Sequence, residues 1–278
     1  MDNRQTLQYL CSLCNTVLKE SSCLDIDPRK VTEPCPNCGH SLAYTLTINR
    51  PREPIEPVVF HVATTVKALT FDVKQLDSFY SGIRTGETLC IIGRPATTLV
   101  TRLCVRALLA KRQGGLQSQV LFIDAGNTSD IYQCISFARQ YGMDLTKVLD
   151  GIIVSRVFTI HQLASLVITE LPEAMKRFGA GLVVISGLLR MFLEDPQVDK
   201  KEARRLLGEM MIAVKRISRD VMVVVSTEET RDYEDIFEQF KNRLELCGNA
   251  TLVVNAISKY RSRKFSLPEK ALKMVKVE

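Results

Sequence analysis

The stretch "GETLCIIGRPATTLVTRL" (residues 86–103) carries an apolar segment into a glycine, a short turn and an apolar helix. A strand, a glycine turn and a helix in this order are the parts of a phosphate-binding loop. That loop reads G-x-x-x-x-G-K-[ST], because its glycines let backbone N–H groups surround the phosphates, its lysine neutralises them and its hydroxyl binds magnesium. Gly93 is present, but the lysine is missing. The stretch predicts the frame of a nucleotide site and leaves its chemistry in question.

Apolar runs alternate with amphipathic stretches from residue 60 onwards. The apolar runs are residues 88–93, 119–124, 151–157, 181–186, 221–226 and 250–255. They are continuous rather than alternating, as expected for strands that are covered on both faces. Helical patterns lie between them, at residues 98–113, 129–141, 159–177 and 200–218. This alternation predicts an α/β fold with a mostly parallel sheet flanked by helices.

Two Cys-x2-Cys pairs stand near the N-terminus: Cys11 with Cys14, and Cys35 with Cys38. Each pair places two thiolates on one tight turn, and two such turns complete a tetrahedral site for structural Zn²⁺. Cys23 and His40 are spare candidates outside this pattern. We expect a small zinc-ribbon domain over residues 1–48, stabilised by the metal because so short a segment builds little core. The spacing leaves open whether the ribbon binds nucleic acid or protein.

Residues 49–59 read "NRPREPIEPVV", with three prolines at a spacing of three. Prolines in that rhythm favour an extended, semi-rigid spacer. We therefore expect a linker here, followed by the α/β domain over residues 60–278.

Composition places weak limits on partners and location. The net charge is +6 and the isoelectric point is about 8.8, a basic excess that permits nucleic acid as a partner without showing it. No apolar run reaches the roughly 20 residues that span a bilayer, and the N-terminal "MDNRQT" lacks the apolar region of a signal peptide. We expect a cytoplasmic protein that does not associate with membranes.

The order of the segments resembles the RecA/RadA recombinase family, especially archaeal RadA and its shorter paralogues, over about residues 68–265. The matching segments are "LDSFYSGIRTGETLCIIG" (76–93), "TRLCVRALL" (101–109), "VLFIDAGNT" (120–128), "LVVISGLLRMF" (182–192) and "VMVVVST" (221–227). The resemblance implies a RecA-like domain with its nucleotide site at the carboxyl ends of the strands, where open α/β sheets bind ligands.

The charged positions that the resemblance marks for phosphoryl transfer are replaced in this sequence. Leu99 or Val100 stands where the family carries lysine, and Ser186 stands where a carboxylate holds magnesium. The water-orienting glutamate falls near Gly126, just after Asp124. Because phosphoryl transfer depends on positioning and charge stabilisation, we expect no ATP hydrolysis and do not expect ATP as a cofactor.

Part of the phosphate-loop pattern remains in the sequence. A helix N-terminus can hold an anion even without the lysine. The candidate residues of this loop are Gly93, Arg94, Thr97, Thr98 and Thr101. Thr101 aligns with the magnesium-binding hydroxyl only if one residue has been inserted. Arg94 and Arg102 are the nearby cations that could reach inward in place of the lysine.

A basic strip near the C-terminus, "KYRSRKF" (residues 259–265), is a candidate nucleic-acid surface. On a strand, Lys259, Arg261 and Arg263 would share one face, and Tyr260 and Lys264 would lie on the other. Such a strip can follow a phosphate backbone while the aromatic ring stacks on a base. The alternative is a solvated edge strand that its charges protect from aggregation.

These observations predict a non-catalytic RecA/RadA-like accessory protein of DNA recombination or repair. It would bind DNA, a partner RecA-family ATPase, another repair protein, or more than one of these. The first alternative is a divergent DNA-dependent ATPase completed by a partner subunit. The second is a structural scaffold subunit of a larger nucleic-acid machine.

Overall fold

The computed structural model describes residues 6–11, 17–21, 44–49, 68–194, 199–259 and 261–275. The chain divides into two compact units, Met1–Ala63 and Thr64–Glu278. In the first unit the description extends to the backbone of three strands. Three of the predicted zinc ligands (Cys14, Cys35 and Cys38) and most of the predicted linker therefore lie outside the described residues, as does the side chain of Cys11.

The first unit contains a three-stranded antiparallel sheet. Its strands are β1 (Thr6–Cys11), β2 (Val17–Ser21) and β3 (Tyr44–Asn49), in the order β2-β1-β3. Cys11 is the last residue of β1 and pairs with Tyr44, the first residue of β3. The first Cys-x2-Cys pair thus starts where β1 ends, and the second pair precedes β3 in the sequence.

The second unit is built on an eight-stranded mixed sheet in the order β11-β10-β9-β4-β8-β7-β5-β6. The strands are β4 (Thr88–Ile92), β5 (Gln119–Asp124), β6 (Ile152–Arg156), β7 (Ala180–Ser186), β8 (Met222–Thr227), β9 (Asn242–Gly248), β10 (Thr251–Ser258) and β11 (Arg261–Pro268). The strands β9, β4, β8, β7, β5 and β6 run parallel to one another. Strands β10 and β11 are added antiparallel at one edge. The α/β prediction with a mostly parallel sheet is confirmed.

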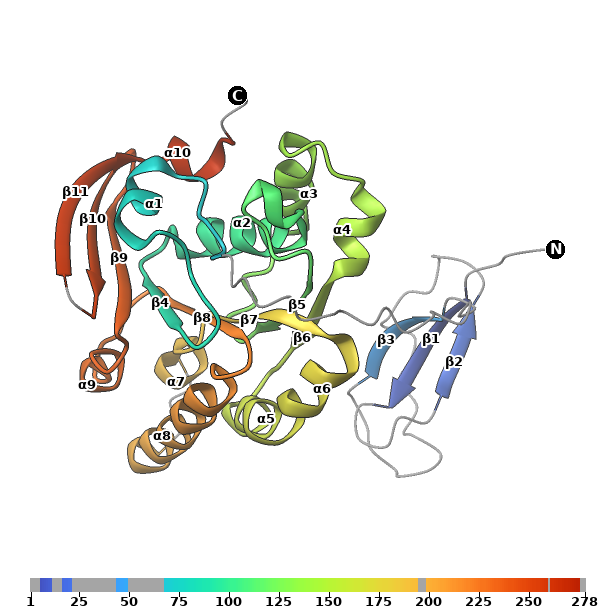
Figure 1. Cartoon of the computed structure of the whole chain (residues 1–278). Helices are drawn as coiled ribbons and strands as arrows, with labels where there is room; N and C mark the ends of the chain where they lie inside the picture. Colours follow the sequence, from blue (N-terminus) through green and yellow to red (C-terminus); the bar gives the residue numbers. More distant parts are fainter. Residues whose placement is uncertain are drawn as a thin grey trace. The chain divides into compact units, whose positions relative to one another are not determined.

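Helices cover both faces of this sheet (Figure 1). They are α1 (Lys74–Tyr80), α2 (Ala96–Leu108), α3 (Ile131–Gln140), α4 (Leu145–Gly151), α5 (Ile160–Ser165), α6 (Leu171–Phe178), α7 (Arg190–Glu194), α8 (Lys200–Ile217), α9 (Glu234–Phe237) and α10 (Lys270–Lys273), with shorter turns at Lys111–Gln113 and Leu166–Glu170. Helices α5, α6 and α8 share one apolar core with the sheet, and α1 and α2 share the other. No helix among the described residues is long and apolar enough to span a membrane.

The continuous apolar strands explain why both faces are buried. Leu89 and Ile91 of β4 belong to the core beneath α1 and α2, whereas Cys90 between them belongs to the core beneath α8. On α8, which forms where a helical pattern was predicted, the core that contains Cys90 includes the apolar residues Leu206, Leu207, Met210, Val214 and Ile217. Because successive strand residues point to opposite faces, an apolar run rather than an alternating one is required here.

Helix α2 is anchored by a buried arginine. The guanidinium of Arg102 is fully buried, pairs with the Asp72 carboxylate and donates to the backbone carbonyls of Ala271, Leu272 and Met274. These bonds hold the segments before β4 and after β11 against the same helix. A buried charge is tolerated here because acceptors surround it.

Candidate functional site

The glycine after β4 is required by packing. Gly93 has a φ of +120°, and a Cβ at this position would overlap the carbonyl oxygen of Leu246 on β9. Its N–H donates to the Thr227 carbonyl at the end of β8, over 2.9 Å. Gly93 therefore lets the chain turn closely against β8 and β9 after β4. Packing alone accounts for a glycine at this position, without a bound phosphate.

The loop that follows is shorter than the phosphate-binding motif. Helix α2 begins at Ala96, so only Arg94 and Pro95 separate Gly93 from the helix. The Ala96 N–H donates to the Gly93 carbonyl over 2.9 Å, which closes the turn on itself. A phosphate-binding loop needs four residues between its glycines and leaves its N–H groups free.

The lysine position lies inside the core. Leu99 and Val100 are both fully buried on α2 and pack in the core it shares with the sheet. Thr101 is also buried, and its hydroxyl donates to the Thr97 carbonyl one turn earlier, over 2.9 Å. The first turns of α2 therefore carry apolar side chains where the motif has its lysine. The hydroxyl at the motif's Ser/Thr position is already bonded within the helix.

The remaining loop candidates are scattered. Thr98 accepts a hydrogen bond from the Gln133 side chain over 3.2 Å, whereas Arg94 is exposed. Arg102 does not turn toward the loop, because its guanidinium is held by Asp72 and the C-terminal carbonyls on another side of α2. The expectation that it could reach inward is therefore wrong. Arg94 is the nearby cation that stays accessible.

The magnesium position has become part of a buried hydroxyl network. Ser186 ends β7, is fully buried and lies 2.8 Å from the Thr128 hydroxyl and 3.2 Å from the Ser226 hydroxyl. The sequence offered a signal for this network, since hydroxyl residues follow or end three neighbouring strands, but Thr128 was not singled out. These groups satisfy one another and supply no negative charge.

The position of the water-orienting glutamate is closed by backbone packing. A Cβ on Gly126 would lie 2.9 Å from the Cα of Gly187, and one on Gly187 would lie 2.5 Å from the Cα of Gly126. The Arg190 guanidinium donates to the Gly126 carbonyl over 2.7 Å. The loops after β5 and β7 thus pack directly on each other, and no side chain fits at residue 126 without moving them.

Asp124, the acid that remains nearby, is engaged in holding its own loop. Its carboxylate is fully buried and accepts the N–H groups of Thr128 (2.7 Å) and Ser129 (3.2 Å). Arg156 at the end of β6 forms an ion pair with it over 3.4 Å. A carboxylate with these partners caps a turn and is not oriented toward water.

Buried thiols add no nucleophile to this site. Burial raises the pKa of the Cys90 and Cys104 thiols, and it raises that of Cys134 to about 11, assisted by the neighbouring Asp130. All three are therefore protonated at neutral pH. They pack as small apolar side chains.

The basic strip forms a hairpin at the far edge of the sheet. Ser258 of β10 pairs with Arg261 of β11, so Lys259 lies in the connecting turn and not on a strand face as expected. Tyr260 lies outside the described residues.

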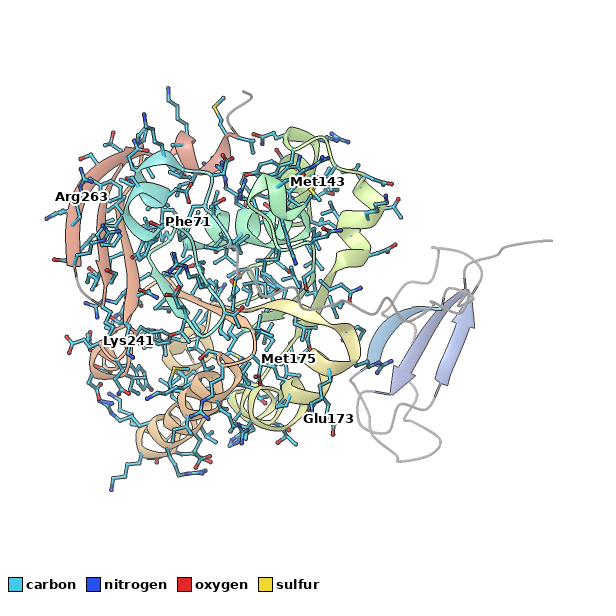
Figure 2. The ribbon with its side chains drawn as sticks, viewed as in Figure 1. Phe71, Met143, Glu173, Met175, Lys241 and Arg263 are labelled. Atoms are coloured by element: carbon cyan, nitrogen blue, oxygen red, sulfur yellow. The ribbon has the colours of Figure 1, made fainter. Side chains whose placement is uncertain are left out.

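Strand β11 carries its charges on both faces. Arg261 and Arg263 share a face, with the Arg261 guanidinium 4.7 Å from the centre of the Phe79 ring. Lys264 points to the other face. All three side chains are exposed on the edge strand (Figure 2, where Arg263 is labelled). The strip is thus accessible, and it lies away from the carboxyl ends of β4, β8 and β7.

Comparison with known sequences gives one family and several distant relatives. The sequence model described as Rad51 matches residues 63–236. "Meiotic recombination protein DMC1 homolog A" of Oryza sativa subsp. japonica is 27% identical over 147 residues, which is 50% of this chain and 42% of that protein. "DNA repair and recombination protein RadA" of Cenarchaeum symbiosum (strain A) is 29% identical over 101 residues, 36% of this chain and 25% of that protein. The matched part spans less than half the length of these relatives.

Proposed function

Because the chain belongs to the Rad51 family, we propose that it is a non-catalytic member that acts in DNA recombination or repair by binding. The names of its relatives describe recombination and repair for those proteins. One observation carries the non-catalytic part: α2 begins three residues after Gly93 and presents buried Leu99 and Val100, one of which stands where the family has lysine. A loop of this length cannot place N–H groups around three phosphates.

The binding partner in this proposal is DNA, a RecA-family ATPase, or both. The exposed basic hairpin supports the DNA part, because Arg263 and Lys264 are available to neutralise phosphates on an otherwise unpaired sheet edge. Membership of the Rad51 family, together with the mostly parallel sheet, supports the ATPase part, because the relatives it resembles are recombination proteins. Neither binding to DNA nor binding to an ATPase requires this chain to hydrolyse a nucleotide.

The first unit completes the proposal with a structural Zn²⁺. Cys11, Cys14, Cys35 and Cys38 would hold it, and the metal would supply folding free energy rather than chemistry. The backbone supports this assignment, since Cys11 ends β1 directly opposite the start of β3. Thiolate ligands persist in a reducing compartment, so the proposal places the protein in the cytoplasm.

Fluorescence anisotropy with labelled single-stranded and duplex DNA tests the DNA part. We expect binding that weakens steeply with salt, and a variant R263E/K264E that binds at least about tenfold more weakly. The matched control is K147E/K176E, which makes the same change in net charge at exposed lysines of α4 and α6. An equal loss in the control, or no binding at low salt, would remove DNA as the partner and leave the ATPase version.

A further inference from the structure

The second unit contains a cavity of about 670 Å³ at the amino-terminal ends of its parallel strands, opposite the edge where the phosphate loop lies. We call it the amino-edge cavity. It is bounded by the end of α1, the loop at residues 81–87, the starts of β4 and β9, helices α8 and α9, and the β10–β11 turn. Its volume falls within the range typical of sites for small ligands.

The lining of the amino-edge cavity is strongly basic. It includes Arg84, Lys215, Lys241, Lys259 and Arg261, which come from separate segments of the chain. Within the described part of the chain, Arg84, Lys215 and Lys241 form no ion pair. Figure 2 shows Lys241 beside α9, at the start of β9. Cations gathered around a concave surface focus a positive potential that attracts anions.

A single acid in the lining does not neutralise these cations. Glu87 accepts the backbone N–H of Arg84 over 2.9 Å, which turns its carboxylate toward the loop at residues 84–87. Arg261 covers the Phe79 ring and is therefore fixed in orientation. Arg84, Lys215 and Lys241, which form no ion pair among the described residues, against this one carboxylate leave a surplus that an anionic ligand of more than one charge would balance.

The same cavity offers an apolar and aromatic floor. Ile83, Met211 and Phe240 line it, together with the half-buried ring of Tyr80. The Tyr80 hydroxyl lies 2.6 Å from the Arg243 carbonyl and 3.1 Å from the Ile257 carbonyl, and burial raises the pKa of Tyr80. The ring is thus held in one place. A floor of this kind accepts the flat apolar face of a nucleobase.

The basic hairpin leads out of this cavity. Lys259 and Arg261 belong to its wall, and Arg263 and Lys264 continue along the exposed edge strand β11. Strand residues advance about 3.3 Å each, so Arg263, which shares a face with Arg261, extends the positive surface beyond the mouth of the cavity, while Lys264 adds charge on the opposite face. A flexible single strand can follow this line into the cavity, whereas a duplex is too wide to enter.

We propose that the amino-edge cavity binds the phosphorylated end of a single-stranded DNA, with the phosphates that follow lying along β11. This inference rests on the proposed function in DNA binding. A terminal phosphate monoester carries close to two negative charges at neutral pH, whereas a diester within the chain carries one. The end of a DNA strand can also enter the cavity alone, whereas an internal nucleotide requires the strand both to enter and to leave it. Both properties favour an end over an internal nucleotide.

The test compares internally labelled oligonucleotides of one sequence that carry a phosphate at the 5′ end, at the 3′ end or at neither. We expect one of the two phosphorylated forms to bind about tenfold tighter than the unphosphorylated form. The variant K215E/K241E should abolish this difference, while K147E/K176E should preserve it. Thermal melting followed by circular dichroism establishes that each variant is folded as the parent is.

The outcomes separate this inference from the function on which it rests. If all three oligonucleotides bind equally, or if K215E/K241E keeps the phosphate preference, the inference fails and DNA binding stands. If none binds at low salt, the DNA part of the proposed function fails with it. Displacement by a free nucleoside monophosphate as effective as by the strand would point to a small nucleotide instead. Equal displacement by polyglutamate would point to an acidic protein, and either result overturns the inference.

Discussion

At the scale of single residues, each position at which the resemblance implies a charge holds a group that fits its surroundings. Leu99 fills a core position, Ser186 joins a hydroxyl network, and Gly126 allows two loops to touch. None of these is a simple gap left by a missing side chain. Restoring one charged residue would therefore meet packing that has adapted to its absence.

The substitution Leu99→Lys tests this adaptation. It places an ammonium group in a fully buried position among apolar side chains, so we expect the free energy of unfolding to fall by roughly 3 kcal/mol or more. Leu99→Met keeps the volume and should cost less than about 1.5 kcal/mol. Urea denaturation of both variants gives the comparison. A lysine variant as stable as the parent would show that residue 99 has access to water.

Some of these residue roles could be expected from the sequence and others could not. The loss of lysine and of the metal-binding carboxylate is visible at Leu99 and Ser186, because a motif assigns those positions. The contact between Gly126 and Gly187 joins residues 61 positions apart and leaves no local pattern. The sequence suggested Arg102 as an inward cation because it could not show Asp72 and the C-terminal carbonyls that hold it.

At the scale of elements, α2 joins the two ends of the second unit. Arg102 binds Asp72 on one side and the carbonyls around α10 on the other. Arg102→Met keeps much of the side-chain volume but removes the donor to the carbonyls of Ala271, Leu272 and Met274 and leaves Asp72 to Tyr141 and Arg106. We expect a loss of about 3–5 kcal/mol in the free energy of unfolding and faster hydrogen exchange at residues 270–275.

The control for this prediction is Arg205→Met on α8. Arg205 is exposed and pairs with Glu209 one turn away, so its loss should cost less than about 1 kcal/mol. Hydrogen exchange at residues 270–275 should not change in the control. If the two variants behave alike, the anchoring role of Arg102 is wrong.

Helices α2 and α3 also carry buried thiols, which give a pH dependence with a definite sign. The pKa of Cys134 is raised to about 11 in the folded state, and that of Cys104 is raised as well. A raised pKa contributes stability below the ordinary thiol range, and the contribution is lost as the pH rises toward the folded-state value. We therefore expect the free energy of unfolding to fall above about pH 8.5.

Urea denaturation at a series of alkaline pH values measures this slope. Cys134→Ala should make it shallower by up to about 1.4 kcal/mol per pH unit, the limit for one titrating group. At neutral pH, Cys134 in the folded protein should resist alkylation. Rapid alkylation, or a slope unchanged by the substitution, would contradict the protonated and buried state of this thiol.

The elements themselves were predictable where the pattern was long. Six apolar runs correspond to β4, β5, β6, β7, β8 and β10, because each is continuous and bounded by polar residues. The start of α2 was expected at residue 98 and occurs at Ala96, because the motif suggested a longer loop than the one that forms. The turn at Lys259 was missed because neither glycine nor asparagine marks it.

At the scale of the whole molecule, the two units have different sources of stability. The second unit has an apolar core on each face of its sheet and a smaller third cluster between α2, α3 and α4. The first unit spans few residues, and its proposed Zn²⁺ would replace the missing core. Loss of the metal should then unfold the first unit and leave the second intact.

Elemental analysis of the purified protein tests the metal assignment. We expect one zinc per chain, lost in the variant C35S/C38S and retained in C23S, which removes a cysteine outside the pairs. The β-rich circular dichroism of the first unit should decrease with the metal, while the main melting transition of the second unit should remain. Zinc retained by C35S/C38S would show that these cysteines are not its ligands.

The two ends of the parallel sheet differ in the space and the charge that they offer to a ligand. The carboxyl end, where open α/β sheets bind their ligands, is closed by α2, by the Gly126–Gly187 contact and by buried hydroxyls. The amino end holds a basic cavity that continues into an exposed hairpin. The cavity could not be read from the sequence, because its cations come from segments as far apart as Arg84 and Arg261.

The claim on which this account depends is that the loop after β4 no longer accepts a nucleotide. Isothermal titration of the full chain with Mg²⁺ and ATP measures it most directly, with a competent Rad51-family ATPase titrated in the same buffer as the control. We predict no saturable heat up to about 1 mM ATP. One-to-one binding in the micromolar range that is weakened by Arg94→Glu, at the exposed cation of this loop, would contradict the account.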